Sequence, residues 1–265
     1  MSGSDKSARI ANRISAPPYS GIAGIYDSVL GNAMAPYIRK SFDHCVSAYH
    51  IRFKSIADIG CGTGTFLAHL PRKYHHVAKI GVDKSPAMLR IAKRRNAGNN
   101  ARFICQDITR LRLPKNVDLI TCNGDTLNYL LTPTRLNDTF NACYRNLNDG
   151  GHFVFDLIAG GKRQGNAGTT VQDMTLGNIR SIWTVSTDFS KGLSVANIVT
   201  FLPKNDGSII TNVRELHAQR WYGIPLINRL LNQAGFTIRS IFEVDSLKRV
   251  TPASFWVKYV ATRKL

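Results

Sequence analysis

The sequence lacks any apolar run long enough to cross a bilayer. No window of the 265-residue sequence approaches the roughly 20 apolar residues that a transmembrane helix needs. The N-terminal residues 1–21 also lack the apolar core of a secretion signal. With 43% hydrophobic and 20% charged residues, the chain is long enough to bury one substantial core. We therefore expect a soluble cytoplasmic protein that has no membrane partner.

The cysteines form neither pairs nor a ligand pattern. There are five of them, an odd number, and no CxxC pair occurs; they are Cys45, Cys61, Cys105, Cys122 and Cys143. This spacing argues against a zinc site and against a disulfide framework. We expect no bound metal, and the scattered thiols suit a reducing compartment.

Acidic residues are scarce. The chain has 17 Asp and Glu against 35 Lys and Arg, which gives a formal net charge of +18. Such a charge attracts phosphates, acidic substrates, nucleic acid or anionic lipid head groups. The basic residues cluster only in short runs, such as RIAKRR at residues 90–95. The charge therefore restricts the partner without naming it, and we favour a solvated basic surface as its explanation.

Strand-like and helix-like segments alternate in the first part of the chain. Residues 77–83, 101–107, 117–125 and 150–158 are short, rich in β-branched and aromatic residues, and bounded by turn formers. Between them, Ser-Pro and Thr-Pro pairs begin helices predicted at residues 85–95 and 132–147. This alternation predicts a doubly wound α/β sheet of parallel strands with right-handed crossovers. Ligands of such sheets bind at the carboxyl ends of the strands.

The pattern changes after Ile158. Residues 159–170 are predicted as a loop, and residues 178–189, 193–203 and 208–222 as a meander of strands separated by SKG and KNDG turns. A helix with a glycine C-cap then covers residues 224–236, and strands at 237–244 and 255–263 finish the sheet. We expect four parts: an N-terminal helical cap (1–50), a cofactor-binding core (51–160), an antiparallel insertion (161–222) and a C-terminal part completing the core (223–265).

The stretch ADIGCGTGTF, residues 57–66, indicates the cofactor. Its glycines Gly60, Gly62 and Gly64 follow a strand and let a ligand approach the backbone. The spacing GxGxG differs from the GxGxxG of dinucleotide-binding folds, and Asp58 stands two residues before the first glycine. A carboxylate there would repel a pyrophosphate but attract an ammonium or sulfonium group. The sequence therefore favours S-adenosylmethionine over NAD.

Acidic residues also end the next strands. Asp83 is placed to accept both ribose hydroxyls, and Asp107 to accept from the adenine amino group, with Met88 and Ile108 beside the ring. The run CNGD then brings Asn123, Gly124 and Asp125 to the mouth of the same pocket. Each carboxylate alone is more often a turn or cap residue, but three in succession favour a shared site.

These motifs together resemble a family. ADIGCGTGTF, GVDKSPAML, CQDI, CNGDTLNYLL and YRNLNDGGHFVFDL look like a class I S-adenosylmethionine-dependent methyltransferase over residues 19–265. The runs YSGIAGIYDSVL and RELHAQRWY resemble small-molecule members with a meander lid, such as glycine and sugar-nucleotide amine N-methyltransferases. The resemblance implies a seven-stranded Rossmann-like sheet with an antiparallel β lid, and it places tyrosines of the YD segment near the methyl donor. The expected cofactor-binding residues are Tyr19, Tyr26, Asp58, Gly60, Cys61, Gly62, Gly64, Asp83, Lys84, Met88, Asp107, Ile108, Asn123 and Gly124.

The acceptor is less defined than the donor. Base-amine methyltransferases carry an Asn/Asp-Pro-Pro-aromatic tetrad where this chain has NGDT, and Cys122 lacks the preceding proline expected of a carbon-5 nucleophile. We therefore expect an anionic small molecule with an amine or hydroxyl acceptor. The main alternative is tRNA or another nucleic acid, held by phosphate contacts, and a non-catalytic cofactor-binding subunit is a second alternative.

Catalysis asks for positioning, exclusion of water and removal of one proton. Asp125, His217 and Glu215 are the candidates for accepting that proton, and Tyr26 is expected close to the reacting atoms. In RELHAQRW, strand alternation sends Arg214 to one face, and Glu215, His217 and Gln219 to the other. A structural role for His217 is left open. Arg214 and Arg220 are expected to hold a carboxylate or phosphate of the substrate. The oligomeric state is left open.

Overall fold

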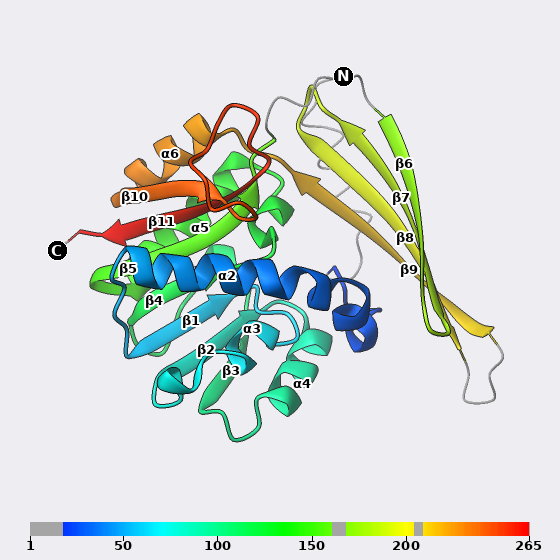
Figure 1. Cartoon of the computed structure of the whole chain (residues 1–265), viewed down its shortest axis with the longest axis horizontal. Coiled ribbons are helices and arrows are strands. Elements are labelled where there is room, and N and C mark those ends of the chain that lie inside the picture. Colours follow the sequence, from blue (N-terminus) through cyan, green and yellow to red (C-terminus); the bar gives the residue numbers. More distant parts are fainter. Residues whose placement is uncertain (1–17, 161–167, 204–208, 265) are drawn as a thin grey trace.

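The computed structural model describes residues 18–160, 168–203 and 209–264. Two sheets make up most of it: a seven-stranded sheet in the order β10-β11-β5-β4-β1-β2-β3, and a separate four-stranded sheet in the order β6-β7-β8-β9 (Figure 1). The strands of the first sheet are β1 (Ser55–Ile59), β2 (Ala78–Asp83), β3 (Ala101–Cys105), β4 (Val117–Cys122), β5 (Leu147–Ile158), β10 (Phe236–Glu243) and β11 (Trp256–Arg263).

The larger sheet has the doubly wound order that the alternation predicted. Strands β1 to β5 pair in parallel, whereas β11 runs antiparallel to both β5 and β10. The register sets Ile59 opposite Val82 and Asp83 opposite Cys105, so the carboxyl ends of β1, β2 and β3 share one edge. The predicted fold class, including the late hairpin and the inserted antiparallel strands, is confirmed.

The helices begin and end at the signals read from the sequence. In α4 (Pro86–Arg95) the Ser85 hydroxyl accepts from the Met88 N–H, and in α5 (Pro133–Asn146) Thr132 accepts from the Arg135 N–H, both at 3.3 Å. Helix α6 (Ile224–Gln233) ends before Gly235, whose φ of +97° favours glycine. The remaining helical elements are η1 (Ala23–Ile25), η2 (Asp27–Gly31), α2 (Asn32–Ala48), α3 (Thr65–Ala68), η3 (Arg72–Tyr74), η4 (Ile108–Arg110) and η5 (Thr126–Tyr129).

The inserted sheet has one strand more than the sequence suggested. Its strands are β6 (Gly168–Leu176), β7 (Ile179–Asp188), β8 (Leu193–Pro203) and β9 (Ile209–Arg220). The predicted loop at 159–170 is therefore wrong at 168–170, which belong to β6; residues 161–167 and the predicted KNDG turn lie outside the described residues. Strand β6 is exposed on both faces, so it carries no alternation of apolar and polar residues. Only its pairing with β7 makes it a strand.

The run NDGG, residues 148–151, lies inside a strand. Strand β5 begins at Leu147, so residues 148–151 lie inside it, where its pairing with β4 shifts register between Val117 and Leu119. Gly150 has a φ of +72°. Gly150 and Gly151 thus lie at an irregularity of the strand, a position where residues without a side chain are favoured.

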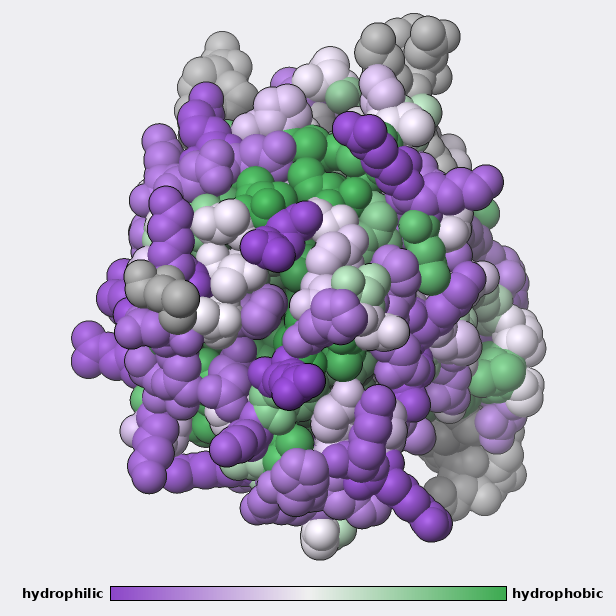
Figure 2. Space-filling model, turned by 60° about the vertical axis from the view of Figure 1, so that its left-hand side comes forward, coloured by the Kyte–Doolittle hydropathy of each residue, from purple (hydrophilic) through white to green (hydrophobic). Residues whose placement is uncertain are grey.

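Apolar layers cover both faces of the larger sheet. One cluster packs α5 and α6 on the sheet, with Phe155 and Tyr259 stacked at 4.9 Å between ring centroids; the other packs Phe42 of α2 against Phe53 and its neighbours. Figure 2 shows one face of the molecule, where hydrophilic side chains surround a smaller apolar area. Among the described residues, no helix is long and apolar enough to cross a membrane. The four-part division of the chain stays a proposal.

A buried ion pair lies within this sheet. Lys258 on β11 and Asp156 on β5 are both fully buried, and Lys258 Nζ donates to Asp156 Oδ2 at 2.9 Å. The ammonium also donates to Asn123 Oδ1 at 2.9 Å. Because the two partners are far from water, each depends on the other for its charge to be compensated.

Replacing Lys258 should therefore destabilise the protein strongly. We expect Lys258→Ala to lower the free energy of unfolding by about 3–5 kcal/mol, because it leaves the Asp156 carboxylate buried without its partner. Arg180→Ala, which breaks the exposed pair with Asp173, is the matched control and should change stability little. Urea unfolding of both variants measures the difference, and equal midpoints would refute the role of the buried pair.

Candidate functional site

The glycine loop follows β1 directly and has a left-handed backbone. Gly60, Gly62 and Gly64 have φ values of +69°, +52° and +72°. A Cβ on Gly60 would come within 2.3 Å of Thr126, and one on Gly64 within 2.9 Å of Ala92, whereas nothing lies within 4 Å of the same position at Gly62. Gly60 and Gly64 thus allow close packing, while Gly62 leaves open space for a ligand. The helix that follows, α3, has only four residues.

Asp58 is buried at the end of β1. Its Oδ1 accepts from the Thr121 hydroxyl at 2.7 Å and from Asn123 Nδ2 at 3.2 Å. Burial raises the pKa of this carboxyl to about 7, although both hydrogen bonds favour the ionised form. The bond from Lys258 to Asn123 Oδ1 fixes the orientation of that amide, so Asn123 presents its NH2 to Asp58. A cation bound beside Asp58 would hold it ionised.

Asp83 and Asp107 end the neighbouring strands. Asp83 accepts from the Gly62 N–H at 2.9 Å and from the Ser85 N–H at 2.8 Å, and burial raises its pKa. Asp107 accepts from Thr109 and pairs with Arg135 at 2.9 Å. Burial raises the pKa of Asp107, but these hydrogen bonds lower it by more. The two carboxylates therefore order the loops around the site, and their contacts with ribose and adenine stay proposals.

One cavity of about 310 Å³ brings most of the predicted residues together. The predicted residues that line it are Tyr19, Tyr26, Asp58, Gly60, Cys61, Gly62, Asp83, Lys84, Met88, Asp107, Ile108, Asn123 and Gly124. Those that do not line it are Gly64, Asp125, Arg214, His217 and Arg220. The acidic residues, the open backbone at Gly62 and the apolar Met88 and Ile108 fit a ligand that has a cationic end, hydroxyl groups and a flat ring.

Asp125 lies between the lining residues Gly124 and Thr126. Its backbone is left-handed, with a φ of +51°, and its N–H donates to Asp156 at 2.8 Å. Gln219 of β9 donates to its Oδ2 at 2.6 Å. Burial raises the pKa of Asp125 to about 7, so near neutral pH this carboxylate can take up a proton.

His217 belongs to a hydrogen-bonded group at the same end of the cavity. Its Nε2 lies 2.7 Å from Glu215 Oε2 and its Nδ1 lies 3.0 Å from the Tyr129 hydroxyl, which donates to the Tyr19 hydroxyl at 2.7 Å. Burial raises the pKa of both tyrosines, so their hydroxyls stay protonated. Burial also raises the pKa of Glu215, but the bonds from His217 and from backbone N–H groups lower it by more. Both nitrogens of His217 are thus engaged, and the ring reaches the cavity through the tyrosines.

Strand alternation in β9 is as expected, but the arginines lie away from the cavity. Glu215, His217 and Gln219 all contact residues of the site, whereas Arg214 is exposed. Arg220 donates to the Leu131 carbonyl at 3.3 Å. Substrate binding by Arg214 and Arg220 therefore stays a prediction without support from the lining of the cavity.

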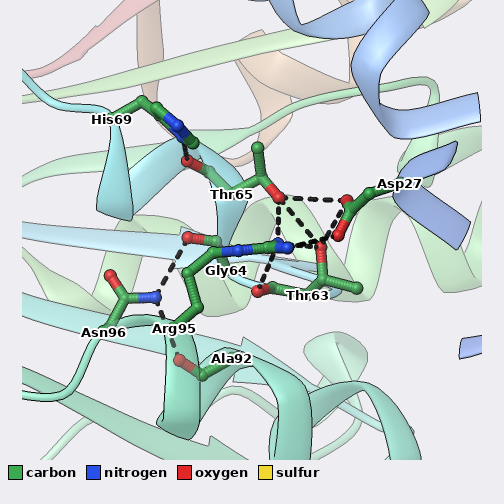
Figure 3. Close-up of polar contacts among 8 residues, drawn as sticks. All are labelled: Asp27, Thr63, Gly64, Thr65, His69, Ala92, Arg95 and Asn96. Atoms are coloured by element: carbon green, nitrogen blue, oxygen red, sulfur yellow. Dashed lines mark hydrogen bonds and ion pairs between the residues drawn. The ribbon is translucent and has the colours of Figure 1, made fainter. Parts of the chain in front are cut away.

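Four residues that the sequence did not single out hold the N-terminal segment, defined here as residues 18–31, against the glycine loop (Figure 3). Asp27 Oδ1 accepts from the hydroxyls of Thr63 and Thr65 at 2.8 and 3.0 Å. Arg95 Nη2 pairs with Asp27 Oδ2 at 2.6 Å, and its Nη1 donates to the Thr63 carbonyl at 3.0 Å. The threonines in GTGT and the aspartate after Tyr26 were the available signals. Their partner Arg95 lies 68 residues from Asp27 and was read only as part of a basic run.

The comparisons with known proteins agree with this geometry. A family model described as a methyltransferase domain matches residues 56–151. A protein named as a methyltransferase in Geobacillus sp. (strain WCH70) is 32% identical over 193 residues, which are 71% of this chain and 76% of that protein.

Two solved structures share the fold. An S-adenosylmethionine-dependent methyltransferase from Clostridium acetobutylicum ATCC 824 has a TM-score of 0.79 at 24% identity, and the match covers 94% of this chain and 100% of that one. An amino pentose methyltransferase from Micromonospora echinaspora, involved in calicheamicin biosynthesis, has a TM-score of 0.69 at 18% identity, covering 91% and 97%.

Binding of S-adenosylhomocysteine should depend on the ionisation of Asp58. Because the pKa of Asp58 is about 7 without ligand and the ligand carries an ammonium group, affinity should rise by up to about tenfold between pH 6 and pH 8. Asp58→Asn should remove this pH dependence and weaken binding roughly 10- to 100-fold at pH 8, the loss of a charge-assisted contact. Calorimetry measures both effects, and NAD should give no heat. An Asp58→Asn variant with the wild-type pH dependence would contradict the assignment of Asp58 as the carboxylate beside the ligand's ammonium group.

Proposed function

The chain belongs to the class I S-adenosylmethionine-dependent methyltransferases, and we propose that its acceptor is a small molecule with an amine or hydroxyl group. The observation that supports this acceptor class is the cover over one end of the cavity. Tyr19 of the N-terminal segment, Tyr129 of η5 and His217 of β9 pack edge to face there, with Tyr19 and His217 4.3 Å apart between ring centroids. An end lined by packed aromatic side chains suits a metabolite better than a macromolecule.

The chain's own residues position the reactants and move one proton. S-adenosylmethionine supplies a methyl group on a positively charged sulfur. Asp58, held by Thr121 and Asn123, sits where a carboxylate would attract the cationic end of the donor. Tyr19, Tyr26 and Tyr129 exclude water from the acceptor end. Asp125, next to that cover, accepts the proton that the amine or hydroxyl loses.

The roles of the other predicted catalytic residues follow from this arrangement. His217 acts through Tyr129 and Tyr19, and Tyr26 lines the cavity 5.0 Å from the Tyr19 ring centroid. The proposal does not require a negatively charged acceptor, because Arg214 and Arg220 lie outside the cavity lining. An amine fits the nearby Asp125 carboxylate at least as well.

Exposed cations around β3 support RNA as a second candidate acceptor. Strand β3 is an edge strand, and none of the cations around it forms an ion pair with a described residue; they are Arg72, Lys73, Arg90, Lys93, Arg94, Arg102, Arg110, Arg112 and Lys115. The two acids in residues 70–116 are engaged elsewhere, Asp83 with the glycine loop and Asp107 with Arg135. Such a surface could hold phosphates.

A substrate panel separates the two candidates. We expect labelled methyl transfer to a member of a panel of small amines, hydroxylated metabolites and nucleotide sugars, with little effect of salt and little effect of the triple change Arg90→Glu, Arg94→Glu and Arg102→Glu. Bulk tRNA is the other arm. Salt-sensitive labelling of tRNA that the triple variant loses, without small-molecule turnover, would refute the proposal.

Asp125 should set the acid limb of the pH profile. The carboxylate accepts a proton only when ionised, so at saturating S-adenosylmethionine kcat/KM for the acceptor should fall about tenfold per unit as pH drops below about 7. Asp125→Asn should lose this inflection and lower kcat roughly 100-fold or more, the usual range for general-base catalysis. Asp138→Asn, an exposed aspartate of α5, is the matched control. An unchanged profile in Asp125→Asn would assign proton removal to another group.

A further inference from the structure

Glu215 is one of only two glutamates in the chain, and methyl transfer as described does not use its charge. It lies on β9 with its side chain 10% exposed. Its Oε1 accepts from the Gly21 N–H at 2.6 Å and the Ile22 N–H at 3.3 Å; its Oε2 accepts from the Tyr19 N–H at 2.9 Å and lies 2.7 Å from His217 Nε2. One carboxylate thus joins the inserted sheet to the backbone of the N-terminal segment.

The N-terminal segment is shaped to reach this carboxylate. Tyr19 has a φ of +63°, a left-handed conformation that a bulky side chain rarely adopts without external support. At Gly21, a Cβ would come within 2.5 Å of Val213 Cγ1 and 3.0 Å of Glu215 Oε1. The backbone of residues 19–22 therefore lies directly on β9, and no larger residue fits at position 21 without displacement.

Tyr19 carries this contact to the cavity. Its side chain lines the cavity and meets Tyr129, Tyr26 and His217, the aromatic residues that cover the acceptor end. His217 is itself held by Glu215. The same carboxylate consequently fixes two members of the cover, one through its backbone N–H and the other through its ring.

We propose that Glu215 is a positioning residue that holds the N-terminal segment closed over the methyl donor. Its place in catalysis rests on the proposed function, because closure matters only if methyl transfer takes place in this cavity. The clasp itself, defined as the contact between Glu215 and the N–H groups of residues 19, 21 and 22, is a property of the fold. It can be tested without any acceptor.

Glu215→Gln is the direct test. A carboxamide has one accepting oxygen and turns N–H donors toward backbone N–H groups, so it can keep only part of the clasp. Hydrogen exchange should become at least tenfold faster in peptides covering residues 19–25 and stay unchanged in peptides from β1 and β4. S-adenosylhomocysteine should also dissociate at least tenfold faster in stopped-flow measurements. Unchanged exchange at 19–25 overturns the proposal.

Two further variants make the result specific. Glu243→Gln changes the other glutamate, which accepts from the hydroxyls of the exposed Ser246 and the buried Ser254, and it should alter neither readout. Gly21→Ala disturbs the clasp on the N-terminal segment instead of on β9, because the added Cβ would collide with Val213, and it should reproduce the effect of Glu215→Gln. It decides the question if Glu215→Gln does not fold. Normal protection in a folded Gly21→Ala protein would count against the clasp.

Measurements of turnover distinguish a failure of the clasp from a failure of the proposed function. Once an acceptor is known, Glu215→Gln should lower kcat by at least tenfold with a smaller change in KM, because positioning is lost while the binding groups remain. Fast exchange in a protein that methylates no small molecule would leave the clasp standing and refute the function. Efficient methyl transfer by a Glu215→Gln variant with intact protection would refute the clasp alone.

Discussion

The burial of several carboxylates at one edge of a sheet is the constraint on which the site depends. The buried Asp58 and Asp156 and the half-buried Asp125 lie at the carboxyl ends of β1, β5 and β4, and Lys258 is a buried cation that contacts Asp156 and Asn123. Lys258 contacts Asp156 directly and reaches Asp58 through Asn123; Asp156 in turn accepts from the Asp125 N–H. An antiparallel strand added late in the chain thus stabilises acids that come from the parallel core. At Asp58, where burial raises the pKa, the charge of Lys258 acts in the opposite direction and favours the ionised form.

The N-terminal segment is held over this edge from two sides. Asp27 fastens it to Thr63, Thr65 and Arg95 beside the glycine loop, and Glu215 fastens it to the inserted sheet (Figure 1, Figure 3). Both fastenings use a carboxylate that accepts several hydrogen bonds at once, the arrangement that best compensates a partly buried negative charge. The aromatic cover therefore depends on two acids in a chain that has few. Their cost of desolvation is offset by the hydrogen bonds that each accepts from more than one group.

Local signals in the sequence were sufficient for much of the fold and failed where contacts are distant. Ser85 and Thr132 predicted the starts of α4 and α5 because a helix cap is a local contact, in which a side chain accepts from the N–H three positions further along the chain. Strand β6 was missed because both of its faces are exposed. Alternation placed Glu215, His217 and Gln219 on one face of β9, but it cannot say which face meets the cavity. The Asp27–Arg95 pair joins residues 68 positions apart, and no local pattern encodes such a contact.

The buried acids also bear on the unusual charge of the chain. Burial raises the pKa of Asp58 and of Asp125 to about 7, so near neutral pH part of the acidic charge counted in the formal +18 is absent. Because we propose that the cationic end of the methyl donor lies beside Asp58 and favours its ionised form, we expect binding to release a fraction of a proton. None of the exposed cations around β3 is among the charges that shift the pKa of Asp58 or Asp125. Asp58, Asp83 and Asp107 thus line the cavity with Asp125 beside it, whereas the cations around β3 face solvent and form no ion pair with a described residue.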